Sequence, residues 1–177
     1  LRNAIANDYL NPIAALAKEI GAVNVWRSSA ALGLTSQENA PDQDSLLYTG
    51  GEPNLLQLGT AYAIFANSGV RSGRSDPISG EILPQAVKKV TSTSGSVLYE
   101  EPDARTSAVL DQTLAYLVNH VLSDESARWP SLGYPNELEV GSPVAAKTGS
   151  AQDHRQVWAI GYNPQRLVLI WMGSRGQ

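Results

Sequence analysis

The run Lys147-Thr148-Gly149-Ser150 brings together residue types that can do chemistry. A lysine on a strand edge can hold a carboxylate or depress the pKa of a neighbouring group. The hydroxyls and the Ser150 amide can donate to an anion or a developing oxyanion, and Gly149 lets another chain approach the backbone closely. Such a triplet also arises by chance in about one chain in ten of this length, so an exposed strand lysine before a glycine turn is the competing interpretation.

The elements that must position this run are three predicted strands. They cover about residues 143–150, 155–162 and 166–173, and Asn163-Pro164 turns the last two into a hairpin. The chain before them is largely helical by the spacing of its apolar residues. Helices followed by an antiparallel C-terminal sheet predict a mixed α/β domain.

The N-terminal segment predicts a helix, a loop at about residues 7–11 and a second helix. Asn11 is a good N-cap and Pro12 suits the first helical position, so the second helix is expected to start at Pro12 and to end at Gly21. The other predicted elements are a helix at 25–32, a surface loop at 35–51, a helix from Pro53 to Gly69, a loop at 70–83, a hairpin over 85–101 and one long buried helix over 106–129.

Composition excludes several classes of function. The 177 residues carry a net charge of −4, which gives no basic footprint for nucleic acid. The chain has no cysteine and only two widely separated histidines, so we expect no metal site and no cofactor. Residue 1 is leucine and the only methionine is Met172, which predicts that the chain is a piece or a processed product of a longer protein.

Residues 144–176 resemble the third active-site motif and following strands of class A penicillin-binding proteins. That pattern is Lys-Thr-Gly-Thr/Ser, a short loop, an arginine, and aromatic-rich strands around a Gly-Tyr-x-Pro turn. Residues 1–21 and 50–69 are similar to other family segments in the same order, and 121–133 resembles the 1C-type branch. The resemblance covers nearly all of the chain, and it implies a β-lactamase/DD-transpeptidase-like fold, an antiparallel sheet flanked by helices, left incomplete here.

The chain departs from the family in its other two motifs, Ser-x-x-Lys and Ser-x-Asn. No lysine has a serine three places before it, and no asparagine has a serine two places before it. Asp8 stands where the family's second-motif serine would fall, and Asn11 could be that motif's asparagine displaced by one residue. Because the family's nucleophile lies upstream of its second motif, we expect residues 1–177 to be the C-terminal half of a penicillin-binding transpeptidase domain.

The resemblance implies acyl transfer through a serine acyl-enzyme, with β-lactams and stem peptides ending in D-Ala-D-Ala as ligands. Lys147 would supply positive charge, the Thr148 and Ser150 hydroxyls would bind the substrate carboxylate beside Gly149, and the Ser150 amide would form half an oxyanion hole. The parent protein would be a peptidoglycan synthase, anchored in the membrane with an extracytoplasmic active site and an upstream glycosyltransferase domain. The alternatives are a catalytically degenerate binding or scaffold module and a β-lactamase-type hydrolase, which the 121–133 segment and the Gly-Tyr-x-Pro hairpin disfavour.

Two geometric expectations follow. Lys147 should be partly buried at a sheet edge with its ammonium toward residues 7–11, where the carboxylate of Asp8 would pair with it. The apolar run Leu167–Met172 suits a strand buried on both faces, and its free edge should pair with another polypeptide, such as the remainder of the parent chain.

Overall fold

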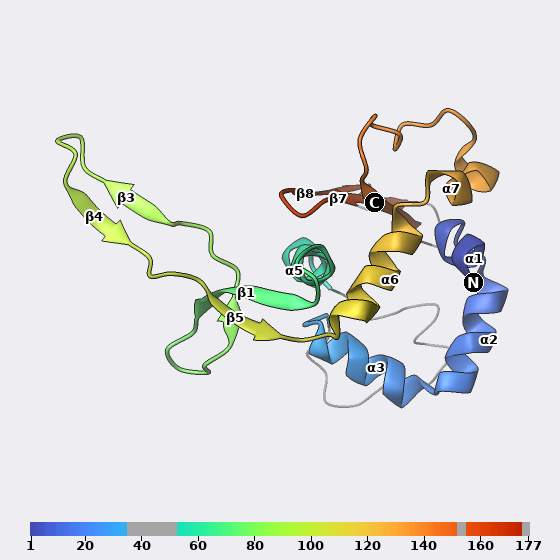
Figure 1. Cartoon of the computed structure of the whole chain (residues 1–177), viewed down its shortest axis with the longest axis horizontal. Helices are drawn as coiled ribbons and strands as arrows, with labels where there is room; N and C mark the ends of the chain where they lie inside the picture. Colours follow the sequence, from blue (N-terminus) through green and yellow to red (C-terminus); the bar gives the residue numbers. More distant parts are fainter. Residues whose placement is uncertain (35–52, 152–154, 175–177) are drawn as a thin grey trace.

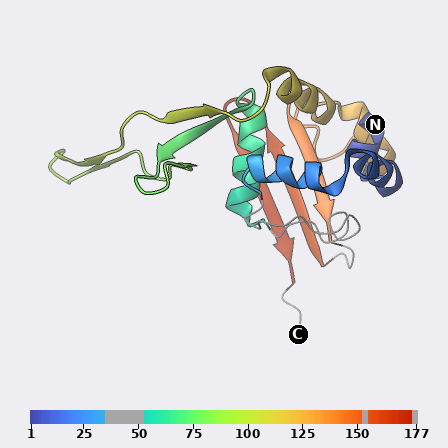
Figure 2. The same ribbon diagram turned by 90° about the horizontal axis from the view of Figure 1, so that it is seen from below.

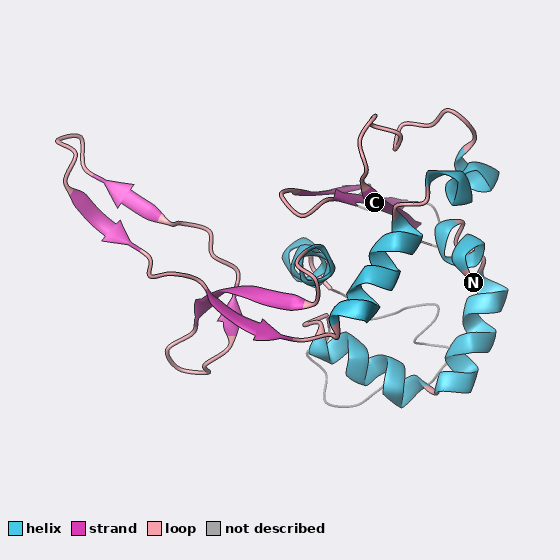
Figure 3. Ribbon diagram, viewed as in Figure 1, coloured by secondary structure: helices cyan, strands magenta, loops and turns pink. Residues whose placement is uncertain are grey.

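A computed structural model describes residues 1–34, 53–151 and 155–174 (Figures 1 and 3). The predicted loop at 35–51 therefore lies outside the described residues. The helices are α1 (Arg2–Ala6), α2 (Leu10–Ile20), α3 (Ala22–Ala31), α5 (Leu55–Ala66), α6 (Gln112–Leu122) and α7 (Glu125–Leu132). The strands are β1 (Val70–Ser75), β2 (Ile82–Leu83), β3 (Lys89–Thr91), β4 (Val97–Glu100), β5 (Arg105–Ala108), β6 (Ala145–Ser150), β7 (Gln156–Tyr162) and β8 (Leu167–Gly173).

The three predicted C-terminal strands are confirmed as an antiparallel sheet in the order β6-β7-β8. In its register Lys147 lies opposite Ile160 and Gly149 lies opposite Trp158, so the Lys-Thr-Gly-Ser run occupies the edge strand β6. The Asn163 side chain accepts hydrogen bonds from the backbone N–H groups of Gln165 and Arg166 and closes the β7–β8 turn. The mixed α/β class is also confirmed.

The sheet packs on helices through one face, with α5 and α6 next to it (Figures 1 and 2). The core cluster there consists of Leu122, Ala145, Ile160 and Tyr162. On β8, Leu167 and Leu169 pack against that cluster, while Val168, Ile170 and Met172 on the opposite face are 58%, 53% and 63% exposed. The expectation of a strand buried on both faces is therefore wrong for β8 within the described part of the chain.

The N-terminal helices differ from the prediction at one boundary. Helix α2 begins at Leu10 behind Tyr9, not at Pro12 behind Asn11. Pro12 is still accommodated, because the third residue of a helix needs no intrahelical partner for its N–H. Gly21 ends α2 as predicted, at a positive φ of 86°.

Side-chain caps explain two further differences. The helix predicted from Pro53 begins one residue after Asn54, which forms a capping box with Gln57. The single helix predicted over 106–129 is instead β5 followed by two helices, because the carboxylates of Asp111 and Asp124 each accept a backbone N–H and start a new helix. Helix α6 is also less buried than predicted, since Leu114 is 54% exposed.

Residues 70–108 form an arm whose base, the start of β1, contacts α5, and whose outer part projects away from the helices and from the sheet β6-β7-β8 (Figure 1). The predicted loop at 70–83 contains β1 and β2, and β1 also pairs with β5. The hairpin predicted over 85–101 is confirmed as β3 and β4, whose residues are exposed throughout. Across the described ranges, none of the helices has both the length and the apolar character needed to cross a membrane.

Arg128 on α7 is a buried cation, 2% exposed. Its Nη1 donates to the carbonyl of Leu122 at 2.7 Å and so caps the C-terminal end of α6. Its Nε and Nη2 atoms are buried and have no hydrogen-bond partner among the described residues. Burying unpaired N–H groups opposes folding, so we expect the packing of this side chain to contribute more to stability than its charge.

We therefore expect Arg128→Met, which keeps most of the volume and removes the charge, to change the free energy of unfolding by less than about 1 kcal/mol. Arg128→Ala should lower it by about 2 kcal/mol or more, because it leaves a cavity. Urea unfolding of the two variants measures this, with Arg105→Ala on the exposed strand β5 as the control. A Met variant as unstable as the Ala variant would show that the charged hydrogen bond matters more than the packing.

Candidate functional site

The ammonium of Lys147 makes two short contacts. It donates to Asp8 Oδ1 and to the backbone carbonyl of Thr148, both at 2.5 Å. The Lys147 side chain is 17% exposed and that of Asp8 is 53% exposed. Lys147 therefore lies partly buried on the edge strand with its ammonium toward residues 7–11, as the sequence predicted.

The turn between α1 and α2 places Asp8 at the lysine. Asp8 has a φ of 56°, in the left-handed region that aspartate and asparagine tolerate better than most residues. The N–H of Tyr9 bonds back to the carbonyl of Ala4, which closes this turn tightly against α1. The backbone conformation and the ion pair thus both suit aspartate at this position.

Asn7 fixes this turn to the rest of the molecule, and the sequence did not single it out. Its Nδ2 donates to the carbonyls of Asn3 at 2.8 Å and Ala127 at 2.7 Å. Its Oδ1 accepts from the backbone N–H of Ser131 at 3.0 Å and from its hydroxyl at 2.6 Å. The side chain is 8% exposed, so this buried amide satisfies itself by joining α1 to α7. Its position directly before Asp8 was the only sequence signal for it.

Asn11, the other candidate for the second motif, lies elsewhere. It is an exposed residue in the first turn of α2. The hydrogen bonds of Lys147 go to Asp8 and Thr148, so of the two candidates it is Asp8 that lies in contact with the lysine. His154, which follows the motif in sequence, falls outside the described residues.

The Lys-Thr-Gly-Ser run is flanked by two hollows. One, of about 580 Å³, is lined by Lys147, Thr148 and Gly149 together with Tyr62 and Trp158. The other, of about 340 Å³, is lined by Asp8 and Ser150, again with Thr148 and Gly149, and its wall includes the apolar residues Ile170 and Met172. The run thus presents its hydroxyls and its ammonium to accessible space, as a ligand-binding strand edge must.

Two tyrosines near the lysine stay neutral. Burial raises the pKa of Tyr62 above its ordinary value, and the negative charge of Asp8 raises it further. Burial also raises the pKa of Tyr162, whose hydroxyl donates to Asn119 Oδ1 at 2.7 Å. Neither phenol adds a charge near neutral pH, so Lys147 and Asp8 are the charged side chains among the described residues that line the two hollows.

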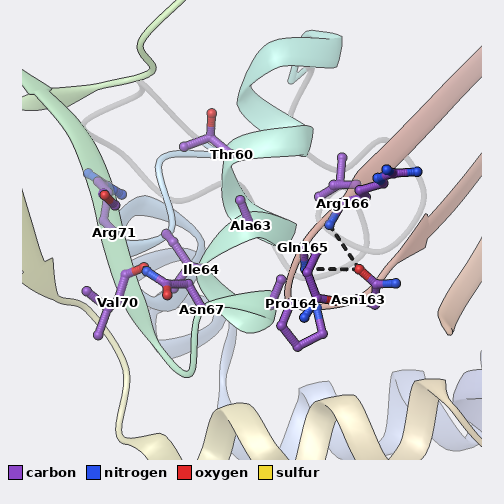
Figure 4. Close-up of a pocket in the computed structure, with 13 residues that line it drawn as sticks. Thr60, Ala63, Ile64, Asn67, Val70, Arg71, Asn163, Pro164, Gln165 and Arg166 are labelled. Atoms are coloured by element: carbon purple, nitrogen blue, oxygen red, sulfur yellow. Dashed lines mark hydrogen bonds between the residues drawn. The ribbon is translucent and has the colours of Figure 1, made fainter. Parts of the chain in front are cut away.

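A separate groove of about 350 Å³ lies between α5, β1 and the β7–β8 turn (Figure 4). Its lining includes Thr60, Asn67, Arg71 and Arg166, and the figure shows the Asn163 turn at its edge. None of the predicted site residues lines it, so it is distinct from the two hollows beside Lys147. No group of three histidine, aspartate or glutamate side chains within the described residues could hold a metal ion.

Comparison with known proteins identifies the relatives of this sequence. No protein-family model matches it. Penicillin-binding protein 1B of Vibrio cholerae is 28% identical over 172 residues, which is 96% of this chain and 20% of that protein. Penicillin-binding protein 1C of Escherichia coli is 26% identical over 129 residues, 73% of this chain and 13% of that protein. The chain thus spans about a fifth or less of the length of these relatives, which are class A penicillin-binding proteins.

Solved structures show the fold. Penicillin-binding protein A of M. tuberculosis, as its imipenem acyl-enzyme complex, superposes with a TM-score of 0.72 at 16% identity, over 98% of this chain and 42% of that one. The D,D-transpeptidase domain of a peptidoglycan glycosyltransferase from Eggerthella lenta gives 0.72 at 18% identity, over 100% of this chain and 49% of that one. The predicted β-lactamase/DD-transpeptidase-like fold is confirmed.

We expect Asn7→Ala to lower the free energy of unfolding by about 2–4 kcal/mol, because it strands buried groups of Ala127 and Ser131 without partners. Asn24→Ala on α3 removes two exposed side-chain hydrogen bonds, one donated to the carbonyl of Ile20 and one accepted from Arg27, and should cost less than about 1 kcal/mol. Parallel urea titrations compare the two variants. Equal costs would mean that Asn7 does not hold the turn before Asp8.

Proposed function

Because the chain is related to class A penicillin-binding proteins and has the fold of their transpeptidase domains, we propose that residues 1–177 form the C-terminal half of such a domain in a peptidoglycan synthase. The observation that carries this proposal is the Lys-Thr-Gly-Ser run on the edge strand β6, with the residue at the second-motif position, Asp8, in contact with the lysine ammonium. The chain's span of 42–49% of the matched structures supports the size of the fragment.

The parent's reaction is D-Ala-D-Ala transpeptidation through a serine acyl-enzyme. In this site Lys147 supplies positive charge and helps to bind the carboxylate of the stem peptide or β-lactam, together with the hydroxyls of Thr148 and Ser150. The Ser150 amide donates to the developing oxyanion, and Gly149 lets the ligand strand approach. The nucleophile comes from a Ser-x-x-Lys motif outside these residues, since no serine here has a lysine three places after it.

The resemblance extends to the parent's setting. A class A synthase carries a glycosyltransferase domain and a membrane anchor, and its transpeptidase faces the cell-wall side of the membrane. Peptidoglycan stem peptides and β-lactams are its ligands. Penicillin-binding protein A of M. tuberculosis, which shares the fold, forms an acyl-enzyme with the β-lactam imipenem, and this supports the β-lactam part of the proposal.

A second candidate is a catalytically degenerate module that keeps the fold for binding or scaffolding. One observation favours it. The Asp8 carboxylate pairs with the ammonium of Lys147, whereas a serine at this position would leave that positive charge unpaired. The two candidates differ in whether a Ser-x-x-Lys nucleophile of the parent is acylated.

The chain alone should form no penicilloyl adduct, because acylation needs an activated nucleophile and these residues supply none. The parent protein should gain one adduct that maps outside residues 1–177. Incubation of both with a labelled penicillin, followed by intact-mass and peptide mass spectrometry, measures this. An adduct on a serine of this chain would refute the fragment assignment, and an unmodified parent with an intact Ser-x-x-Lys would favour the degenerate module.

The outer edge of β8, which pairs with no strand among the described residues, gives an independent test. Strand β8 pairs with β7 on one side, and an unpaired apolar edge tends to recruit another strand. We expect the remainder of the parent to pair with residues 167–172, so their amides should exchange hydrogen more slowly in the parent than in the isolated chain. Residues 89–91 on the exposed hairpin serve as the control, with equal exchange in both. Equal exchange at 167–172 in the parent and in a monomeric chain would contradict the pairing.

A further inference from the structure

We propose that Asp8 is a specificity-determining residue: its carboxylate occupies Lys147 and competes with a ligand's carboxylate for that ammonium. This inference rests on the proposed function, in which Lys147 helps to bind the terminal carboxylate of a stem peptide or β-lactam. The Asp8 carboxylate acts as a counter-ion of Lys147, and an anionic ligand has to displace it. The cleft therefore favours ligands whose carboxylate accepts hydrogen bonds from the hydroxyls of Thr148 and Ser150 instead.

The hydrogen bonds of Lys147 show how little of the cation is free. An ammonium has three N–H donors, of which one goes to Asp8 and one to the carbonyl of Thr148. A ligand carboxylate that approaches Lys147 therefore finds at most one unused donor. It also meets the negative charge of Asp8 within the same small space, and this repulsion offsets the attraction of the lysine.

The surroundings do not restore the missing positive charge. Tyr62, which lines the hollow beside Lys147, is a neutral phenol, and burial together with Asp8 keeps its proton in place. In the hollow on the other side of the strand, Asp8 is the one charged residue among the described residues that line it. The hydroxyls of Thr148 and Ser150 also line that hollow and remain the groups that can bind a carboxylate without competing with Asp8.

Asp8 also has a backbone role, which the experiment must separate from its charge. Its φ of 56° suits asparagine as well as aspartate. Asp8→Asn keeps the size, the backbone preference and an oxygen acceptor, and it removes only the negative charge. If the aspartate serves the turn alone, this variant will bind carboxylates as the natural chain does.

The chain offers a matched ion pair as a control. Lys89 and Glu100 on the hairpin lie 3.0 Å apart, with side chains 45% and 54% exposed, and neither lines one of the hollows beside Lys147. Glu100→Gln removes the partner of Lys89 as Asp8→Asn removes that of Lys147. Glu100→Gln should leave the ammonium of Lys89 without its carboxylate partner, at a place that lines neither hollow.

The experiment is competitive acetylation of the whole chain, read for each of the four lysines by peptide mass spectrometry. The probe is N-acetyl-D-alanine, and its neutral amide serves as the uncharged comparison. In the natural chain we expect the carboxylate to leave the acetylation rate of Lys147 unchanged. In Asp8→Asn it should slow that rate about twofold to fivefold, the range expected when a partly exposed ion pair is released. Lys89 in Glu100→Gln should show no such protection.

Two results would overturn the proposal. One is carboxylate protection of Lys147 in the natural chain equal to that in Asp8→Asn, and the other is no protection in either. If Asp8→Asn is unstable, Asp8→Ser repeats the test once circular dichroism shows that it is folded. Protection of Lys147 by the carboxylate in the natural chain contradicts the proposal without any variant. This measurement needs no nucleophile. The inference about Asp8 can therefore fail while penicillin still acylates the parent, and it can hold while the parent is not acylated.

Discussion

The side chain of Asn7 joins the first helix of the chain to α7. Three of its four hydrogen bonds join the end of α1 to α7, segments that are more than a hundred residues apart in sequence, and the fourth goes back to Asn3 on α1. With α1 fixed in this way, the turn that follows presents Asp8 to Lys147 on β6. The contact between Asp8 and Lys147 thus depends on a buried amide that itself touches neither charge, and a loose Asn7 would leave the ion pair without a fixed geometry.

Much of the sheet could be predicted from the sequence because its signals are local. The Asn163-Pro164 turn and the apolar runs on either side of it determine the β7–β8 hairpin, and the side chain of Asn163 indeed closes the turn. The position of Lys147 toward residues 7–11 came from the order of the family's motifs, and the structure places Asp8 at that ammonium. Both the residues of a local turn and the order of motifs can be recognised in the sequence alone.

The remaining features depend on contacts that single-sequence patterns do not encode. Asp111 and Asp124 divide the region predicted as one helix. The sequence alone does not distinguish an aspartate on a helix surface from one at an N-cap. The role of Asn7 arises only when α7 folds beside α1, so the sequence marks this residue by nothing more than its position directly before Asp8. The exposed side chains of Val168, Ile170 and Met172 likewise reflect which partners are present, since an apolar strand has the same sequence whether its second face is covered or open.

Because of the arm formed by residues 70–108, we expect the molecule to unfold in two parts, the outer hairpin of the arm and the body around the core. Its outer hairpin, β3 with β4, is exposed along its whole length and gains little from the core around Ile160 and Tyr162. An isolated two-stranded hairpin is only marginally stable in water, so we expect this hairpin to open and close on its own while the body stays folded. Its opening therefore carries almost no information about the Lys147 site, and a probe placed there would report neither ligand binding nor global unfolding.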